Sequence, residues 1–270
     1  MIKLLLIPMV LGGVFALLVV RRIVIRLRTL KAQLAAYRRG DYEGQLKAIE
    51  AFRVGKSEPG HYLGFRGSAC YQLGRLQEAE QALRRSLAME TNAQLRTVCR
   101  DELGRVLMEQ GRCDEAEDCF RQCIVEWPKR GGSHRSIAEL LLRSGQEKEA
   151  ALTAARQAEA DDRAASVGVS KLGKEEHNVN LSESLAVLAW ALAANGAGAE
   201  ALEPVLKEAF ELCPETTIPI RAELHYFAGH AYAALGNQSE SQRHLHRALA
   251  VDPIGNYGRL GGAALATAVH

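Results

Sequence analysis

The chain has 270 residues, of which 47% are hydrophobic, 24% charged and 6% aromatic, and this apolar share excludes wholesale disorder. Residues 1–40 hold eight basic and no acidic side chains, whereas residues 41–270 hold 26 basic and 32 acidic ones. The bulk of the chain is therefore acidic, which argues against generic nucleic-acid binding. Six cysteines are too sparse and irregular for the disulfide framework of a small secreted domain.

The N-terminal segment from Leu4 to Val20 has no charged or strongly polar residue. Its 17 residues span about 26 Å as a helix, and snorkelling of the two arginines that follow covers the small deficit against a hydrocarbon core. We therefore expect residues 1–25 to form a transmembrane anchor that contacts the membrane through residues 4–20.

The basic residues around this segment predict its orientation. Only Lys3 precedes it, whereas seven basic residues lie between Arg21 and Arg39. By the positive-inside rule we expect a single-pass membrane protein whose C-terminal part is cytoplasmic. A cleaved signal peptide is the alternative, with a mature start near Leu17 and an outward-facing soluble domain.

Beyond the anchor, six glycines each separate two apolar helical stretches, and their spacings are 34, 37, 34, 51 and 40 residues. This period predicts helix-turn-helix repeats over residues 26–253, with five to six repeats. The glycines at the predicted turns are Gly40, Gly74, Gly111, Gly145, Gly196 and Gly236.

The residues around each turn repeat as well. Small residues are expected where the two helices of a repeat touch, and larger apolar residues are expected to fill the space opposite them. The small set is Gly67, Gly104, Ala138, Ala189 and Gly229 before the turns, and Ala79, Ala116, Ala150, Ala201, Ser241, Ser86, Cys123 and Ala248 after them. The large set after the turns is Leu83, Phe120, Val205 and Leu245. The first repeat departs from the pattern, with Gln33, Gln45 and Phe52 at small-residue positions.

Two segments lack the helical period. Residues 161–180 are polar, and we interpret them as a long loop inserted in the repeats, either a binding element or a tolerated insertion. Residues 254–270 follow Pro253 and begin with a glycine-rich stretch, which predicts a linker and then a short capping helix from Ala263.

The stretch from Leu103 to Phe120 and the stretch from Ala228 to Pro253 resemble the tetratricopeptide-repeat (TPR) family most closely. The resemblance implies an all-α fold, a right-handed superhelix of helix-turn-helix repeats, here preceded by the single transmembrane helix. It also implies a concave groove, lined by the first helix of each repeat, that binds a protein or peptide segment. The groove residues by this resemblance are Tyr71, Gln72, Asp101, Arg105, Met108, Arg135, Glu139, Leu142, Trp190, Tyr226 and His230.

Chemistry-bearing motifs are missing from the sequence. No C-x-x-C pair, H-E-x-x-H motif, P-loop or G-x-S-x-G motif occurs, and the histidines, among them His225, His244 and His246, lack metal-ligand spacing and are expected at the surface. Cys119 and Cys123 lie four residues apart on one helix face, but Cys123 occupies a packing position. We therefore expect neither an enzyme nor a metal or other cofactor.

The resulting hypothesis is a non-enzymatic, membrane-tethered scaffold or adaptor that holds a partner segment in the groove at the cytoplasmic face of a membrane. The alternative is a structural, self-associating membrane platform or assembly factor, in which homo-oligomers form through the anchors or the end repeats.

Overall fold

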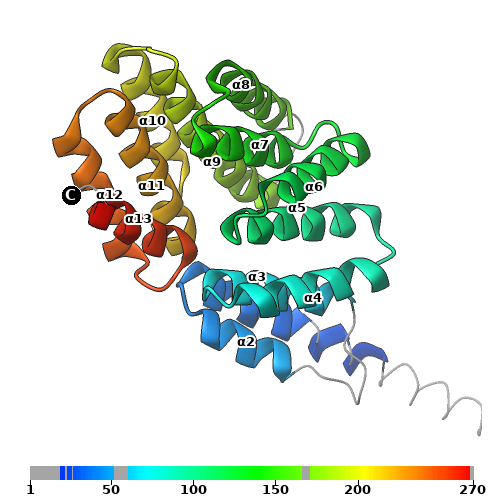
Figure 1. The fold of residues 1–270 in the computed structure, drawn as a ribbon. Helices are drawn as coiled ribbons and strands as arrows, with labels where there is room; N and C mark the ends of the chain where they lie inside the picture. Colours follow the sequence, from blue (N-terminus) through cyan, green and yellow to red (C-terminus); the bar gives the residue numbers. More distant parts are fainter. Residues whose placement is uncertain (1–18, 22, 26, 52–59, 166–170, 268–270) are drawn as a thin grey trace, which may run out of the picture.

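The computed structural model describes residues 19–21, 23–25, 27–51, 60–165 and 171–267 (Figure 1). These ranges contain helices and turns and no strand. The all-α helical-repeat fold expected from the sequence is therefore confirmed.

After a helical segment that ends at residue 38, twelve helices follow along the described chain. That segment and α2 form the first repeat, the next ten helices form five further pairs in sequence, and the last helix stands alone. The bounds are α2 Tyr42–Glu50, α3 Gly60–Gln72, α4 Leu76–Met89, α5 Ala93–Glu109, α6 Cys113–Glu126, α7 Gly131–Ser144, α8 Lys148–Ala165, α9 Lys171–Ala194, α10 Ala199–Leu212, α11 Ile218–Ala234, α12 Gln238–Val251 and α13 Asn256–Thr267.

The six glycines predicted at the turns are the positive-φ residues of the described chain, with φ between 68° and 85°. A left-handed residue lets the first helix end and the chain reverse, and glycine adopts this conformation without a Cβ clash. The turn positions are therefore confirmed at all six sites.

The predicted contact between the two helices of a repeat is confirmed in three repeats. A Cβ added to Gly104 would lie 2.4 Å from Phe120, and one added to Gly67 would lie 2.5 Å from Leu83. The same arrangement recurs between Gly229 and Leu245, at 2.7 Å. Glycine is thus required at these places because the large side chain of the second helix rests on its backbone.

The fourth and fifth repeats depart from the predicted register by one residue. Ala150 and Ala201 are exposed, whereas the buried neighbours are Ala151 and Leu202. The reason is the turn, because α8 and α10 each begin three residues after their turn glycine, whereas α4, α6 and α12 begin two residues after theirs.

The interpretation of residues 161–180 as a loop was wrong for most of the segment. Helix α8 continues to Ala165, and α9 begins at Lys171, so only residues 166–170 lie outside the described residues. The apolar period is weak there because residues 174–180 of α9 are exposed or only partly buried. Arg135 of α7 lies 2.7 Å from Glu183, and Arg38 lies 3.1 Å from Glu175.

The interpretation of the stretch after Pro253 as a linker was also wrong, because α13 begins at Asn256. Its glycines serve close packing on α12. A Cβ added to Gly258 would lie 1.7 Å from the carbonyl oxygen of Asp252, and one added to Gly261 would lie 3.1 Å from that of Leu245. The glycine-rich composition therefore reflects a helix contact.

The membrane localisation predicted from residues 4–20 is corrected. Residues 1–18 lie outside the described residues, and no helix in the described part is both long and apolar enough to cross a bilayer. Helix α9 has the length, but charged residues such as Lys174, Glu175, Glu176 and Glu183 interrupt it. The single-pass cytoplasmic assignment therefore has no support.

The repeats curve until the two ends of the array meet. The Tyr42 hydroxyl of α2 donates a hydrogen bond to Asp252, which follows α12, although 210 residues separate them. Gly40, in the first turn, has Ile218 of α11 as its nearest neighbour, at 3.2 Å from an added Cβ. In Figure 1, α13 correspondingly lies beside the end of α3. The described array is thus closed, and its concave side becomes the centre of the molecule.

Candidate functional site

The residues predicted to line an open groove lie in this centre. Ten of the eleven are less than 9% exposed, and His230 is partly buried. They come from the first helices of successive repeats, as expected, but their contacts are with other residues of the same inner surface and with α13. Whether any of them contacts a partner remains a prediction.

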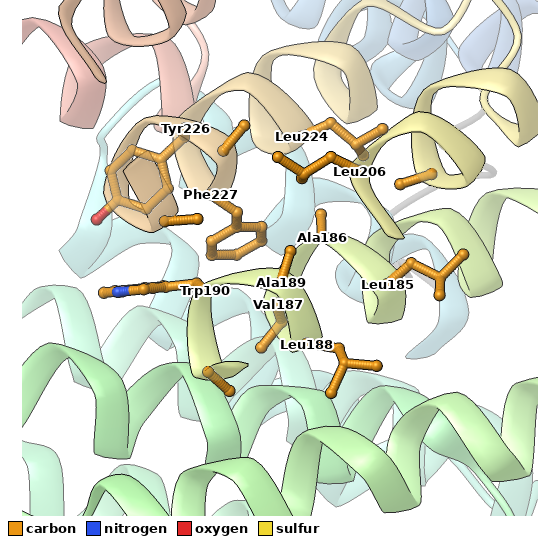
Figure 2. Close-up of a cluster of buried hydrophobic side chains, with 14 of the residues drawn as sticks. Leu185, Ala186, Val187, Leu188, Ala189, Trp190, Leu206, Leu224, Tyr226 and Phe227 are labelled. Atoms are coloured by element: carbon orange, nitrogen blue, oxygen red, sulfur yellow. The ribbon is translucent and has the colours of Figure 1, made fainter. Parts of the chain in front are cut away.

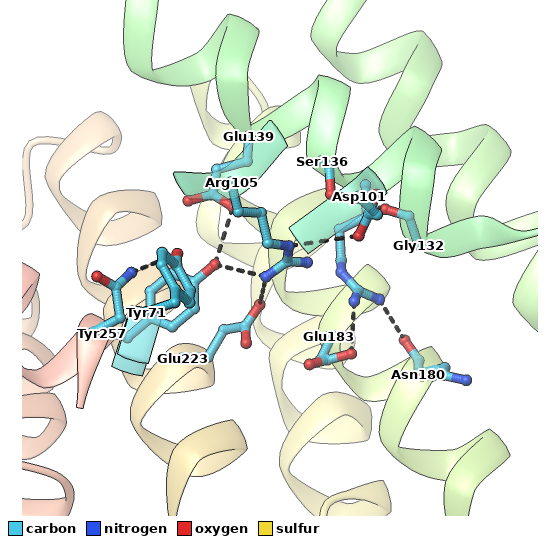
Figure 3. A network of polar contacts seen from close by, with 12 residues as sticks. Tyr71, Asp101, Arg105, Gly132, Ser136, Glu139, Asn180, Glu183, Glu223 and Tyr257 are labelled. Carbon is cyan, nitrogen blue, oxygen red and sulfur yellow. Dashed lines mark hydrogen bonds and ion pairs between the residues drawn. The ribbon is translucent and has the colours of Figure 1, made fainter. Parts of the chain in front are cut away.

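Arg105 of α5 occupies the middle of a polar network (Figure 3). It donates a hydrogen bond to the Tyr257 hydroxyl, at 3.2 Å, and its guanidinium lies 3.7 Å from Asp101 and 3.8 Å from Glu223. Tyr257 in turn donates to Glu139, at 3.0 Å. One residue of the terminal helix therefore joins α5 to α7.

A second arginine extends the network toward α9. Arg135 pairs with Glu183, at 2.7 Å, and donates to the carbonyl oxygen of Asn180, at 3.3 Å. Burial raises the pKa of Glu139 and raises that of Glu223 well above the usual carboxyl range, because the charged form loses its hydration. The network is thus internal, and three of its buried atoms, Arg135 Nε, Glu139 Oε1 and Glu223 Oε1, have no hydrogen-bond partner among the described residues.

An aromatic cluster forms the other side of the centre (Figure 2). Trp190 of α9 packs edge-on against Tyr226 and stacks on His230, with ring centroids 6.5 and 4.7 Å apart. Burial lowers the pKa of His230 to about 4, so its ring is neutral at pH 7. These predicted groove residues stabilise the contact between α9 and α11.

Helix α13 covers two further predicted groove residues, Tyr71 and Gln72 of α3, whereas Met108 and Leu142 are buried in the hydrophobic core. Asn256 donates to the Tyr71 hydroxyl, at 2.7 Å, and its backbone N–H donates to Gln72, at 3.0 Å. The Arg259 guanidinium donates to the backbone carbonyl of Gln72. The sequence predicted the start of this helix at Ala263 instead of Asn256, since glycines interrupt the apolar period before Ala263.

A cavity of about 230 Å³ remains open at the first three repeats. It lies between the helical segment 27–38, α2, α3, α4 and α5, and its walls are mostly apolar. Three apolar side chains at its edge are strongly exposed, namely Leu34 at 47%, Leu95 at 39% and Val98 at 38%. Gly64 and Ser68 also line it.

Three hydrogen-bond acceptors line the same cavity. The side-chain carbonyl oxygens of Gln33 and Gln45 are buried without a hydrogen-bond partner, and the Glu102 carboxyl of α5 makes no hydrogen bond or ion pair within the described residues. Gln33 and Gln45 are the departures from the small-residue pattern noted in the first repeat. Two glutamines at positions where the other repeats have small residues were thus the feature of the sequence that indicated this cavity.

A second cavity, of about 410 Å³, lies on the other side of the segment 27–38. Its charged lining consists of Glu175, Glu176, Glu183 and Arg38. Since Arg38 is paired with Glu175, the lining of this second cavity has more acidic than basic side chains.

Candidates for catalytic or metal chemistry were sought in the same way. No group of three or more metal-ligating side chains gathers within the described residues, and the six cysteines are free thiols. Burial raises the pKa of Cys123 to about 12, and its thiol packs on the Thr97 carbonyl, at 3.3 Å. This thiol occupies the packing position expected from the sequence.

These features define an all-α helical-repeat protein whose open site is a cavity at the first three repeats. The family model of the tetratricopeptide repeat matches residues 30–93 and 102–166, slightly under half of the chain. The two matches, on the segments where the helix pairs follow the glycine period, support the tetratricopeptide-repeat family for this chain.

No curated protein matches the chain. Among solved structures, the C-terminal part of a TPR repeat-containing protein from Cytophaga hutchinsonii is 12% identical, with 86% of this chain and 98% of that chain covered and a TM-score of 0.41. YrrB, described as a TPR protein with an unusual peptide-binding site, is 20% identical over 77% and 92%, with a TM-score of 0.37. BtubC from P. vanneervenii is 12% identical over 85% and 89%, with a TM-score of 0.48.

Proposed function

We propose that this chain is a non-enzymatic scaffold that binds a segment of a partner protein in the cavity at its first three repeats. Proteins built of tetratricopeptide repeats generally mediate protein–protein interaction. The observation that carries the proposal is a cavity with exposed apolar side chains at its edge and unpartnered polar groups inside. Partner segments are held by such a combination of an apolar anchor and a few oriented polar contacts.

The closed centre of the molecule supports this choice of site. The side chains expected to line the groove already pair with one another and with α13, so a partner there would have to replace contacts such as Tyr257 to Glu139. At the cavity, by contrast, Val98 and Leu95 lose exposed apolar surface when a segment binds, and burial of apolar area favours association.

Selection from a random peptide library on the immobilised full chain tests the proposal. Enriched peptides are resynthesised with a fluorophore, and their Kd is measured by anisotropy. The blocking variant is Val98→Arg, which places a long charged side chain at the cavity edge. The matched control is Val125→Arg on α6, where Val125 is 80% exposed and does not line the cavity.

We expect micromolar binding to the wild type and to Val125→Arg, and at least tenfold weaker binding to Val98→Arg. The proposal fails if no peptide is enriched over the bare surface, or if Val98→Arg binds the enriched peptides as well as the wild type does. It also fails if sedimentation shows a dimer that Val98→Arg abolishes, because the cavity would then belong to a second copy of the chain.

A further inference from the structure

Three polar groups of the cavity are acceptors without a donor partner among the described residues, namely the side-chain carbonyls of Gln33 and Gln45 and the carboxyl of Glu102. Gln33 is 3% exposed and Gln45 is 4% exposed, and the side-chain carbonyl oxygen of each lacks a partner. A buried carbonyl without a donor costs free energy, and a hydrogen-bond donor supplied by a ligand would remove that cost. In the second, third and sixth repeats, the positions of these glutamines hold glycine before the turn and alanine or serine after it.

Glu102 adds a carboxyl group to the two carbonyls. Its side chain faces the same cavity and forms no ion pair within the part of the chain that the structure describes. Burial raises the pKa of this carboxyl, and nearby Arg105 offsets part of that effect. Arg105 itself lies against Asp101 and Glu223, so it does not neutralise Glu102 by direct contact.

The cavity lining in the described chain contains no lysine or arginine, and its one basic side chain is His61. Its apolar walls include Phe65, Leu83 and Val98, which suit an aliphatic stem. A lysine or arginine side chain has an apolar stem and a terminal cation with three or five N–H donors and no acceptor. The two carbonyls and the Glu102 carboxyl are complementary to the N–H donors of such a side chain, and the apolar walls are complementary to its stem.

We propose that the cavity binds a lysine or arginine side chain of the partner segment, with the cation held by Gln33, Gln45 and Glu102 and the aliphatic stem packed on the apolar walls. This inference rests on the proposed function, because it names the residue of the partner that enters the site. It predicts that peptides selected on the full chain share one basic residue flanked by apolar ones.

Small analogues of the two side chains test the inference without a partner. We would titrate the full chain with n-butylammonium and n-propylguanidinium, and with n-pentanol and pentanoate as matched uncharged and anionic probes. Binding is followed by saturation-transfer NMR. The two cations distinguish lysine from arginine as the preferred anchor.

Two variants connect the binding of these probes to the cavity. Glu102→Gln removes the charge and keeps the shape, and Glu211→Gln on α10 is its matched control, since Glu211 is exposed and remote from the cavity. Gln33→Met removes one acceptor at similar volume. Thermal unfolding of each variant checks that it is folded.

We expect at least one cation to bind tenfold or more tightly than n-pentanol, and pentanoate to bind more weakly than either. Glu102→Gln should lower the affinity for the cations at least fivefold, Gln33→Met by a smaller factor, and Glu211→Gln not at all. Equal affinity for n-pentanol and both cations would overturn the inference, as would an unchanged affinity in folded Glu102→Gln. If either result were obtained while Val98→Arg still weakened the binding of the selected peptides, the inference would be wrong but the proposed scaffold function would be supported.

Discussion

Two histidines on neighbouring helices, His225 and His244, make a pH-sensitive contact. Nδ1 of His225 in α11 lies 3.0 Å from Nδ1 of His244 in α12, beside the rings of Phe210 and Tyr232. One ring donates and the other accepts, so at least the accepting ring is neutral. Burial and the partner imidazole lower the pKa of His225 to about 3, and burial lowers that of His244 to about 4.

The first prediction is a loss of stability in acid that depends on this pair. Histidine in the unfolded chain takes up a proton near pH 6.5, whereas the folded pair does so only near pH 3 to 4. The contribution of the neutral pair to the free energy of unfolding is therefore fully present above pH 6.5 and is lost as the pH is lowered toward 4. Arg221, Arg243 and Arg247 also disfavour the charged forms, and Glu240 favours that of His244.

Urea unfolding at a series of pH values measures this dependence. His244→Gln should flatten the loss between pH 6.5 and 4 by on the order of 2 kcal/mol. His246→Gln is the control, because His246 lies two residues away and is exposed. A wild-type slope in His244→Gln would contradict the prediction. The sequence analysis expected these histidines at the surface, since their pairing depends on how α11 and α12 meet.

The second prediction concerns the hydroxyl that joins α13 to the polar centre. Tyr257→Phe removes the donor to Glu139 and the acceptor of Arg105 and leaves both groups buried. We expect a destabilisation of about 1 to 3 kcal/mol in urea unfolding. Tyr232→Phe serves as the control, because Tyr232 is only partly buried and its hydroxyl makes no hydrogen bond within the described residues. Equal stability of the two variants would contradict the role of Tyr257.

At the level of the elements, the helix pairs could be predicted well because single residues determine them. Each turn needs one left-handed residue, and three of the helix pairs need a glycine under a large side chain, as at Gly104 and Phe120. The first part of helix α13 and the first half of α9 could not be predicted, because their polar and glycine residues are explained only by segments far away in sequence. Asn256 meets Tyr71, for example, across 185 residues.

The third prediction separates two glycines by what surrounds them. Gly104→Ala places a methyl group 2.4 Å from Phe120, so either the ring or the helix must move, and we expect a destabilisation of about 1 to 3 kcal/mol. Gly132→Ala near the start of α7 meets only the flexible end of Arg130, at 3.4 Å. It should be neutral or stabilising by up to about 1 kcal/mol, because alanine favours the helix. Thermal unfolding compares the two, and a smaller loss in Gly104→Ala than in Gly132→Ala would refute the packing argument.

For the molecule as a whole, the closed arrangement joins segments that an open array would keep apart. The fourth prediction uses Tyr42→Phe, which removes the hydroxyl that donates to Asp252. Hydrogen–deuterium exchange should become faster in α2 and also around Asp252 and α13, while α6 keeps its protection. Faster exchange in α2 alone would show that the two ends of the array are not in contact.

The candidate site was predicted only in part at this scale. The sequence indicated the first helices of the repeats as the inner surface, and residues such as Arg105 and Trp190 do lie there. It could not indicate that this surface is covered, because the closure depends on the summed rotation of all the repeats. Nor did it rank Gln33 and Gln45 as site residues, although their departure from the repeat pattern was visible.

The contact of the first turn with α11 and of α2 with Asp252 has a consequence for how such a chain can change in evolution. An open array tolerates the gain or loss of a repeat, because each repeat contacts only its neighbours. Here an added repeat would displace Tyr42 relative to Asp252, and it would also separate Gly40 from Ile218 of α11. The closure therefore constrains the number of repeats between Tyr42 and Asp252.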